Sequence, residues 1–332
     1  MIIKDIGKAK QILQHNGIIA IPTETVYGLA GNVYSDEAIK KIFALKKRPL
    51  YNPLIVHLKS GSSMFDVARE IPENAIMLAN KFWPGPLTLL LKKQDHISDL
   101  ITAGKNTVAL RVPNHPIALT LLNQLDFPLA APSANPFGSI SPTSAEHVLH
   151  YFGQDIDFIL DGGECEKGVE STIIGFENNK PILYRHGSIP IEEIEKVTGK
   201  LTVITNNDIS PNSPGMLSRH YAPKTDTYLT NDVTEFLQNC KGKNVGLLLF
   251  KKSIRNTNTT TTNNNNNNNS SIIIHQEILS TSGDYTEAAK NLYAAMHRLD
   301  EYHLDLIIAE RLPDEGLGKT INDKLERATK KE

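Results

Sequence analysis

The stretch DFILDGGECEKGVESTIIGFENNKPILYRHG, residues 157–187, decides the fold class of this chain. It holds three short apolar runs, at 157–163, 170–176 and 181–187, separated by turns rich in Gly and Asn. Runs of this length with such boundaries are typical of β-strands. Because these strands follow one another with few helices between them, the sequence predicts a mixed, twisted α/β sheet with a concave surface rather than a doubly wound one.

The residues before this stretch mix strands and helices. Strands are expected at 17–22 and 53–58, where apolar residues cluster. A helix is expected at 35–48, with Ser35 or Asp36 as its N-cap. Two more are expected at 116–125, opened by Pro116, and at 143–153, with a capping box formed by Thr143 and Glu146. This pattern supports an α/β class for the first two hundred residues.

The remaining residues predict a linker and a second, smaller domain. Residues 205–225 are rich in Pro, Asn and Ser, which is typical of a linker. Residues 226–332 alternate strands with helices, which predicts a small βα domain with a parallel, Rossmann-like sheet. The Asn/Thr tract at 257–271 inside it is expected to form a disordered surface loop. The predicted domains are therefore 1–204 and 226–332.

The composition excludes several classes of protein. The formal net charge of -2 over 332 residues argues against a strongly basic nucleic-acid-binding surface. The two cysteines, Cys165 and Cys240, lie far apart, which fits a reducing compartment and excludes a Cys-based zinc site. We see no signal peptide and no apolar run approaching a membrane span, so we expect a cytoplasmic protein without membrane contact.

Polar side chains occur where strands should carry few of them. The segment IPTETVYGLA, residues 21–30, follows an apolar strand with Thr23, Glu24, Thr25 and Tyr27, more polar groups than a turn requires. Side chains alternate along a strand, so His57, Arg111 and Arg185 each face away from an apolar stripe. Either this is one solvated sheet face, or it is a polar pocket at the strand ends.

Two further segments could bind phosphate. Lys46, Lys47 and Arg48 stand at the end of a predicted helix, where they either complement the helix dipole or clamp phosphates. The loop of small residues at 131–147 precedes a helix, and its backbone N–H groups could hold an anion. This loop does not contain the P-loop motif. The segment that most resembles that motif, PDEGLGKT at 313–320, has Pro313 in place of the first Gly.

These segments occur together, and in this order, in one known family. They read PTETVYGLA, LKKRPLYNPLIVHL, WPGPLTLLL, VALRVPNHP, APSANPFGSISPT, DGG…GVESTII, YRHG and SPGMLSRHYAP. The set resembles L-threonylcarbamoyladenylate synthases of the YrdC/Sua5 family, in the long Sua5 form, over roughly residues 5–225. The C-terminal residues resemble the second domain of that form, and only the Asn/Thr tract departs from it.

The resemblance implies an enzyme that joins L-threonine, bicarbonate or CO2, and ATP into threonylcarbamoyl-AMP, releasing pyrophosphate. A separate transferase complex would then pass the threonylcarbamoyl group to adenosine 37 of tRNAs that read ANN codons. Mg²⁺ would accompany ATP, no tightly bound organic cofactor is expected, and no Mg²⁺ ligands can be assigned. The implied fold is a twisted sheet with a concave, positively charged cavity.

The resemblance also implies roles for individual residues, carried over by motif position. The implied catalytic cations are Lys46, Arg48 and Arg111, with Lys46 as a phosphate clamp and Arg111 as partner of the substrate carboxylate. The implied threonine pocket comprises Thr25, His57, Arg111, Ala131 (through its backbone) and Ser171. The implied ATP contacts are Arg48, Asn52, Thr107, Ser133, Ser141, Arg185 and Tyr221. Since Tyr221 stands on the linker, that segment would close over the cavity as a lid.

Two other functions share features with this sequence. An RNA-binding or ribosome-associated module is the main alternative, and weak tRNA binding would be compatible with either reading. The slightly acidic charge balance and the lack of a basic–aromatic stretch count against RNA binding as the main function. A hydrogenase maturation factor with a similar domain would need acylphosphatase and zinc-finger segments, and neither is present in this sequence.

Overall fold

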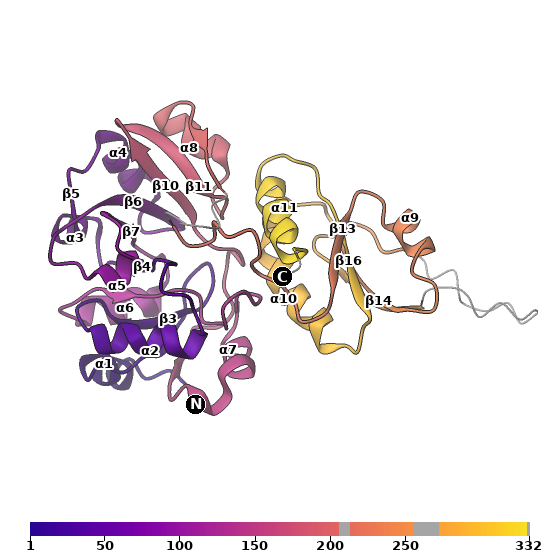
Figure 1. Cartoon of the computed structure of the whole chain (residues 1–332), viewed down its shortest axis with the longest axis horizontal. Coiled ribbons are helices and arrows are strands. Elements are labelled where there is room, and N and C mark those ends of the chain that lie inside the picture. The colour runs from indigo at the N-terminus through magenta and orange to yellow at the C-terminus, as the bar shows by residue number, and fades with distance from the viewer. Residues whose placement is uncertain (206–212, 255–271, 331–332) are drawn as a thin grey trace, which may run out of the picture. The chain divides into compact units, whose positions relative to one another are not determined.

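The computed structural model describes residues 1–205, 213–254 and 272–330. Two compact units divide the chain (Figure 1). The first comprises residues 1–137 and 141–218, and the second comprises 138–140 and 219–332. The Asn/Thr tract and part of the predicted linker, residues 206–212, lie outside the described residues.

The first unit is built from short strands and helices that alternate irregularly. Its helices are α1 (Ile6–Gln14), α2 (Asp36–Lys46), α3 (Met64–Val67), α4 (Glu73–Phe82), α5 (Asp99–Thr102), α6 (Pro116–Gln124), α7 (Ala145–Phe152) and α8 (Ile191–Thr198). Its strands are β1 (Ile2–Ile3), β2 (Ile19–Ile21), β3 (Gly28–Asn32), β4 (Ile55–His57), β5 (Ala68–Arg69), β6 (Leu87–Lys93), β7 (Thr107–Arg111), β8 (Leu129–Ala130), β9 (Ile159–Leu160), β10 (Thr172–Glu177), β11 (Lys180–Arg185) and β12 (Thr202–Val203).

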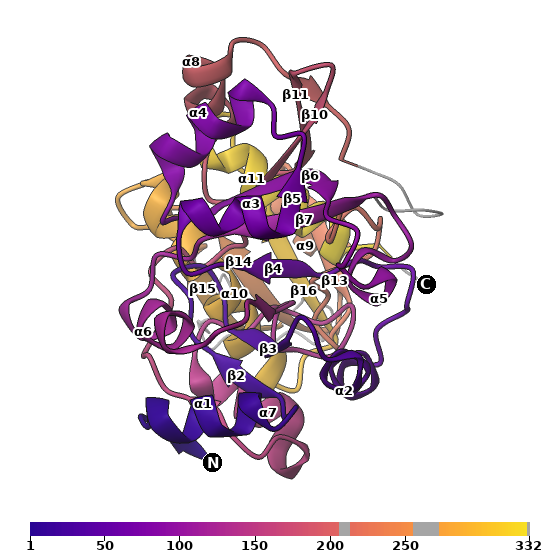
Figure 2. The ribbon, with the colours of Figure 1, turned by 90° about the vertical axis from the view of Figure 1, so that its left-hand side faces the viewer.

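These strands form one mixed sheet in the order β1-β9-β2-β3-β8-β4-β7-β6-β10-β11-β12, with β5 paired to β6. The sheet combines parallel pairs such as β4 with β7 and antiparallel pairs such as β6 with β7. Figure 2 shows β2, β3, β4, β7 and β6 following one another across this unit. The predicted mixed α/β fold is therefore confirmed.

The two faces of this sheet are covered by different helices. In β2, Ile19 and Ile21 face a core that also contains Leu13 of α1 and Leu121 of α6. Ala20 faces the opposite way, into a larger core that takes in residues of α2, α4, α7 and α8. This is the alternation that a strand buried on both faces requires.

Helix boundaries follow local chemistry. Ser35 is the N-cap of α2, as predicted, and its side chain accepts a hydrogen bond from the backbone N–H of Ala38. Pro116 is the first residue of α6, also as predicted. The predicted capping box at 143–153 is wrong by one residue, because Ser144 caps α7 and accepts from the N–H of His147.

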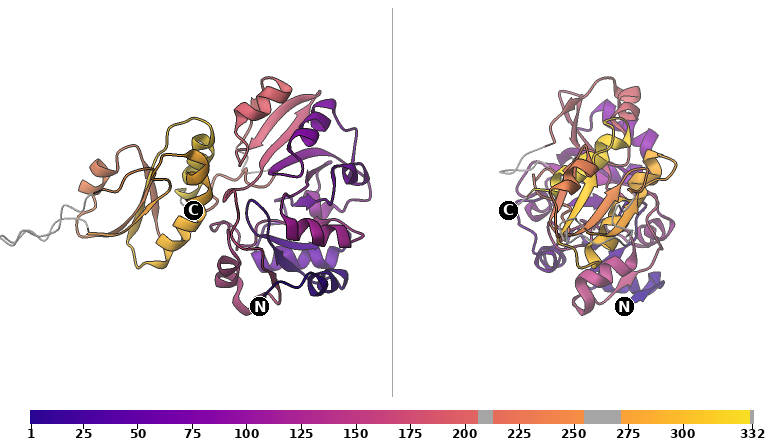
Figure 3. Two further views of the ribbon diagram at one scale, coloured as in Figure 1. Left: turned by 180° about the vertical axis from the view of Figure 1, so that it is seen from behind. Right: turned by 90° about the vertical axis from the view of Figure 1, so that its right-hand side faces the viewer.

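The second unit has a parallel sheet in the order β13-β16-β14-β15, which confirms the predicted βα fold. Its strands are β13 (Thr227–Thr230), β14 (Asn244–Leu249), β15 (Ile272–Ile278) and β16 (Leu306–Glu310), and its helices are α9 (Val233–Gln238), α10 (Tyr285–Glu301) and α11 (Leu317–Ala328). Helix α9 packs on the face formed by Leu247 and Ile308. Helices α10 and α11 lie together on the other face, as Figure 1 and the left view of Figure 3 show.

None of the helices in the described ranges combines the length and the apolar character that crossing a bilayer requires.

Candidate active site

Several of the predicted site residues line up across neighbouring strands of the large sheet. His57 of β4 lies opposite Arg111 of β7 in the register of this parallel pair. On the other side of β7, Leu89 of β6 pairs with Leu110. Strand β10 follows β6, with Ile173 opposite Thr88, and Ile173 also pairs with Arg185 of β11. The strands thus place His57, Arg111, Thr88 and Arg185 in one row.

A small apolar cluster lies on the same sheet face as this row. It consists of Ile55, Leu90, Ala109 and Ile173, all buried, with Tyr184 packed against it. Each of the four stands two residues from a member of the row or from Ser171, so period-two alternation puts them on one face. The sequence predicted an apolar stripe on the opposite face, and the structure shows that the polar face is also partly apolar.

Arg111 is buried and paired with a carboxylate. Its side chain is 4% exposed, and Nη2 lies 2.7 Å from Oε2 of Glu24, whose side chain is 2% exposed. Nε donates a hydrogen bond to the carbonyl of Gly85 at 3.3 Å. Arg111 is therefore a buried cation at the site, and its ion pair with Glu24 was not predicted from the sequence.

His57 is a neutral ring at this site. Burial, helped by the neighbouring Arg111 cation, lowers the pKa of His57 to about 3. Its Nδ1 is buried and has no hydrogen-bond partner among the described residues. The neutral ring can therefore donate or accept a hydrogen bond to a ligand, but it cannot form an ion pair with a carboxylate.

Ser171 joins two strands of the row through its side chain. Its hydroxyl lies 2.7 Å from the hydroxyl of Thr88 and accepts a hydrogen bond from Nη2 of Arg185 at 3.0 Å. Nε of Arg185 donates to the Ser171 carbonyl, also at 3.0 Å. Ser171 of the predicted threonine set and Arg185 of the predicted ATP set are thus in direct contact, with Thr88 as a neighbour that the sequence reading missed.

The segment after β2 is held by its own hydroxyl groups. Thr23 donates from Oγ1 to the carbonyl of Val26, and the hydroxyl of Thr25 lies 2.9 Å from that of Thr23. The hydroxyl of Tyr27 donates to the carbonyl of Gly163, which ties this segment to the Gly-rich turn before β10. These contacts explain much of the polarity of residues 21–30, because the segment turns without regular backbone pairing.

Ala131 lies next to this segment. Its backbone N–H donates to the carbonyl of Ile55, and a Cβ on Gly28 would lie 3.2 Å from the Cβ of Ala131. A side chain at residue 28 would crowd this contact, so glycine permits the close approach. The predicted backbone contact from Ala131 to a substrate is not tested by these bonds.

The predicted phosphate clamp Lys46 is buried and bound to the loop that follows β8. Its Nζ donates to the carbonyls of Ser133 and Asn135, each at 2.5 Å. Burial, with the neighbouring Arg48 cation, holds the pKa of Lys46 well below its ordinary value. Lys46 therefore fixes this loop, and a direct contact with phosphate stays a prediction.

Arg48 is bound to a second predicted ATP contact. Nη2 of Arg48 donates to Oδ1 of Asn52 at 2.6 Å, and Nε donates to the Asn52 carbonyl at 3.1 Å. Asn52 leads directly into β4, so Arg48 braces the segment that carries His57.

The remaining predicted ATP contacts belong to different segments of the chain. Ser141 donates from its hydroxyl to Oε1 of Glu170 at 2.5 Å. Thr107 begins β7 at the end opposite Arg111, about 13 Å away along the strand. Tyr221 belongs to the second unit, where its ring stacks on Tyr293 with centroids 5.6 Å apart. Its role as a lid over ATP stays a prediction.

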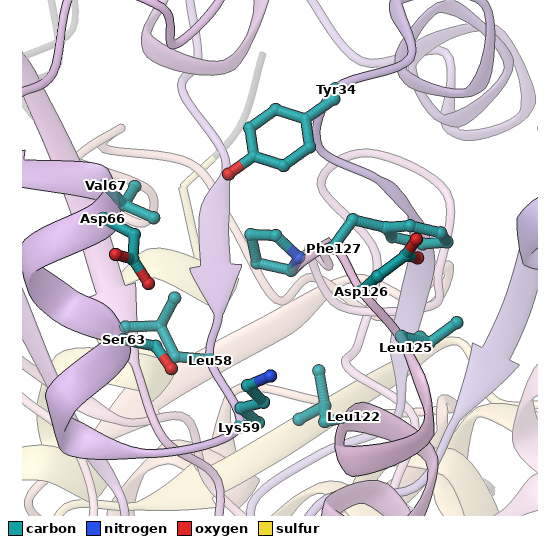
Figure 4. Close-up of a pocket in the computed structure, with 11 residues that line it drawn as sticks. Tyr34, Leu58, Lys59, Ser63, Asp66, Val67, Leu122, Leu125, Asp126 and Phe127 are labelled. Atoms are coloured by element: carbon teal, nitrogen blue, oxygen red, sulfur yellow. The ribbon is translucent and has the colours of Figure 1, made fainter.

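A separate cavity of about 250 Å³ lies away from the row (Figure 4). Leu58, Val67 and Leu122 line its apolar part, and Asp66 and Asp126 lie among its polar side chains. None of the predicted site residues lines it. Its lining draws on both cores of the first unit, because Leu58 and Val67 belong to one core and Leu122 belongs to the other.

Within the described ranges, no three His, Cys, Asp or Glu side chains gather closely enough to hold a metal ion.

Comparisons with known proteins agree with this architecture. Residues 11–187 match the Sua5_yciO_yrdC family model, described as Telomere recombination, and residues 189–329 match the model described as Threonylcarbamoyl-AMP synthase, C-terminal domain. The chain is 38% identical to a threonylcarbamoyl-AMP synthase of Pyrococcus abyssi, covering 97% of this chain and 93% of the relative. It is 39% identical to one of Bacillus subtilis, covering 97% and 92%.

A solved structure is similar over nearly the same length. The crystal structure of P. abyssi Sua5 complexed with L-threonine has a TM-score of 0.84 and 38% identity, covering 98% of this chain and 94% of that one.

Proposed function

Because the chain belongs to the family of Sua5, YciO and YrdC proteins and carries the C-terminal domain of threonylcarbamoyl-AMP synthases, we propose that it makes L-threonylcarbamoyladenylate from L-threonine, bicarbonate or CO2, and ATP. The chain is an enzyme, as its relatives over nearly the full length are. The observation that carries the proposed substrate is the match over 98% of the chain to a Sua5 structure complexed with L-threonine.

The proposed reaction has two bond-forming steps. The un-ionised amine of threonine attacks the carbon of CO2 and, after loss of a proton, gives a carbamate. A carbamate oxygen then attacks the α-phosphorus of ATP, and the bond to the β-phosphate oxygen breaks to release pyrophosphate. Negative charge builds up around phosphorus in the second step, so fixed cations lower its barrier.

The chain supplies such cations close to the row of site residues. Arg185 contacts Ser171, and Arg48 braces the segment leading into β4. We propose both as ATP contacts, together with Asn52, Thr107, Ser133, Ser141 and Tyr221. Mg²⁺ is proposed to arrive with the triphosphate, since this ion is commonly bound through substrate phosphates and few protein carboxylates.

The threonine pocket is proposed at the adjoining part of the row. Arg111 would bind the carboxylate, and Thr25, His57, Ser171 and the backbone of Ala131 would surround the rest of the amino acid. The first four are at most 4% exposed, so substrate would exchange its water for fixed polar groups there.

The product has a proposed destination. We propose that a tRNA threonylcarbamoyl transferase complex consumes it to modify adenosine 37 of ANN-decoding tRNAs, and that the chain acts in the cytoplasm. An acyl adenylate of this kind is a mixed anhydride, so its chemistry calls for a group-transfer reaction as the next step.

Pyrophosphate release tests the proposed function. Wild-type protein should release pyrophosphate from ATP only when both threonine and bicarbonate are present. Arg111→Ala should abolish this threonine-dependent release while ATP binding survives, because the variant loses the carboxylate partner. Arg69→Ala is the matched control, since Arg69 forms a surface ion pair with Asp95. Pyrophosphate release that ignores threonine in the wild type would refute the proposal, and unchanged threonine dependence in Arg111→Ala would remove the role of Arg111.

A further inference from the structure

Glu24 is a buried carboxylate whose bonding is incomplete. Its side chain is 2% exposed, and neither oxygen accepts a hydrogen bond of acceptable geometry from the described residues. Its contact is the ion pair between Oε2 and Nη2 of Arg111. Withdrawing a carboxylate from water costs several kcal/mol unless ion pairing and hydrogen bonds repay it. One buried oxygen, Oε1, therefore lacks the donor that such a group ordinarily has.

The backbone holds Glu24 in place from both sides. Its carbonyl accepts a hydrogen bond from the N–H of Lys167 at 2.7 Å. The neighbouring Thr23 and Thr25 are linked through their hydroxyls. The backbone that carries the carboxylate is thus held by the fold, and the side chain stays buried.

Other titratable groups around the ion pair add no charge at neutral pH. The pKa of His57 is lowered by burial and by Arg111, and the pKa of His115 is lowered chiefly by burial. The pKa of the Cys165 thiol is raised, chiefly by burial and further by Glu24. These two rings and the thiol are therefore neutral, so they leave the charges of Glu24 and Arg111 to offset each other.

On this arrangement, we infer that Glu24 binds the α-ammonium group of the amino-acid substrate through Oε1 in the initial complex, before the amine loses the proton that it must lose to react, while Arg111 binds its carboxylate. The inference rests on the proposed function, which places an amino acid at Arg111. Nη1 of Arg111 makes no hydrogen bond to any described residue, so a donor for the carboxylate is available. Because Glu24 already offsets Arg111, a simple carboxylate would bring an unbalanced charge into a buried site, whereas a zwitterion brings none.

The competing role for Glu24 is to position Arg111 and nothing more. The two roles differ in what the site recognises. A residue that only positions Arg111 affects every ligand with a carboxylate equally. A residue that binds the ammonium group affects only ligands that have one.

The test compares two ligands and two variants by calorimetry. The ligands are L-threonine and (R)-3-hydroxybutyrate, which differs from threonine by lacking the α-amine. The variants are Glu24→Gln, which removes the charge with little change in shape, and Glu164→Gln, which removes a charge from an exposed position on the loop before β10. A hydrogen bond to a charged group corresponds to about 10- to 100-fold in affinity.

We expect wild-type protein and Glu164→Gln to bind threonine at least 10-fold more tightly than (R)-3-hydroxybutyrate. In Glu24→Gln, threonine affinity should fall by about 10- to 100-fold, and (R)-3-hydroxybutyrate should bind as well as before or better. Equal loss for both ligands, or loss for neither, would overturn the inference.

The comparison of the two ligands on the wild type tests the inference even if Glu24→Gln does not fold. Equal affinity of wild-type protein for the two ligands would by itself overturn the inference, because no group would then recognise the amine. Failure of the wild type to bind threonine at all would instead refute the proposed function, so the two failures are distinguishable.

Discussion

At the scale of single residues, the burial of His57 beside a cation makes the stability of the fold depend on pH. The ring lies beside Arg111 in the strand register and is 2% exposed. Burial and the neighbouring cation lower its pKa to about 3, whereas an unfolded histidine has a pKa near 6.5. Between these two pH values, His57 is protonated in the unfolded chain and neutral in the folded chain. Stability must therefore fall as the pH drops through that range.

His57→Asn should remove this part of the acid sensitivity. From pH 7 to pH 5, His57 should cost the wild type about 2 kcal/mol of its free energy of unfolding, and the variant should lack this loss. Urea unfolding followed by fluorescence is suitable, because Trp83 is the one tryptophan in the chain and belongs to the first unit. If the difference in stability between the two proteins is the same at both pH values, His57 is not the buried neutral ring described above.

Residue-scale prediction from sequence succeeds where the strand period decides the outcome. His57 and Arg111 were placed on a polar face by alternation, and the register sets them side by side. The sequence singles out Glu24 as an acidic residue among small polar ones after an apolar strand, but it does not predict its partner. Arg111 lies far along the chain, and no local pattern reports a long-range ion pair.

At the scale of elements, the end of α2 carries a conformational cost. Lys47 follows the helix in the left-handed region, with φ 51° and ψ 38°. This conformation raises the free energy of a residue with a Cβ, whereas glycine adopts it without that strain. The side chain of Lys47 is exposed, whereas its neighbours Lys46 and Arg48 are buried. The sequence singled out this cationic run, but only the structure separates the strained residue from the two buried ones.

Lys47→Gly should stabilise the first unit by about 0.5–1 kcal/mol, because it relieves the strain without removing a buried contact. The same fluorescence-detected urea unfolding measures it. Lys47→Ala is the control, since it removes the same charge but keeps the Cβ. If Lys47→Gly is no more stable than Lys47→Ala, the backbone at residue 47 is not strained.

Element boundaries were predicted best where one residue dominates local structure. Pro116 starts α6 because its ring suits the first helical turn and it has no N–H to satisfy. Thr143 and Ser144 follow one another, and either side chain can serve as the N-cap of α7. The sequence alone does not show which of them does so. Strand β13, at the edge of the small sheet, was not predicted, because its TYLT sequence has little apolar character and it is only partly buried.

At the scale of the molecule, the two compact units have separate cores, and the two family models cover residues 11–187 and 189–329. The mixed α/β class was predictable from the succession of apolar runs. The strand order was not, because β8 lies between β3 and β4 and β9 lies between β1 and β2. Such crossovers depend on pairings between distant segments, which a single sequence does not report. The proposed site depends on this order, since it joins β4, β7, β6, β10 and β11.

The most direct measurement of the proposed function is mass analysis of the product. The protein is incubated with ATP, ¹³C-bicarbonate and threonine, and the nucleotide products are separated rapidly. We predict an adenylate that contains both the threonine and one ¹³C carbon, formed in step with pyrophosphate. Hydrolysis of ATP to AMP or ADP with no adenylate carrying threonine and the labelled carbon would contradict the account.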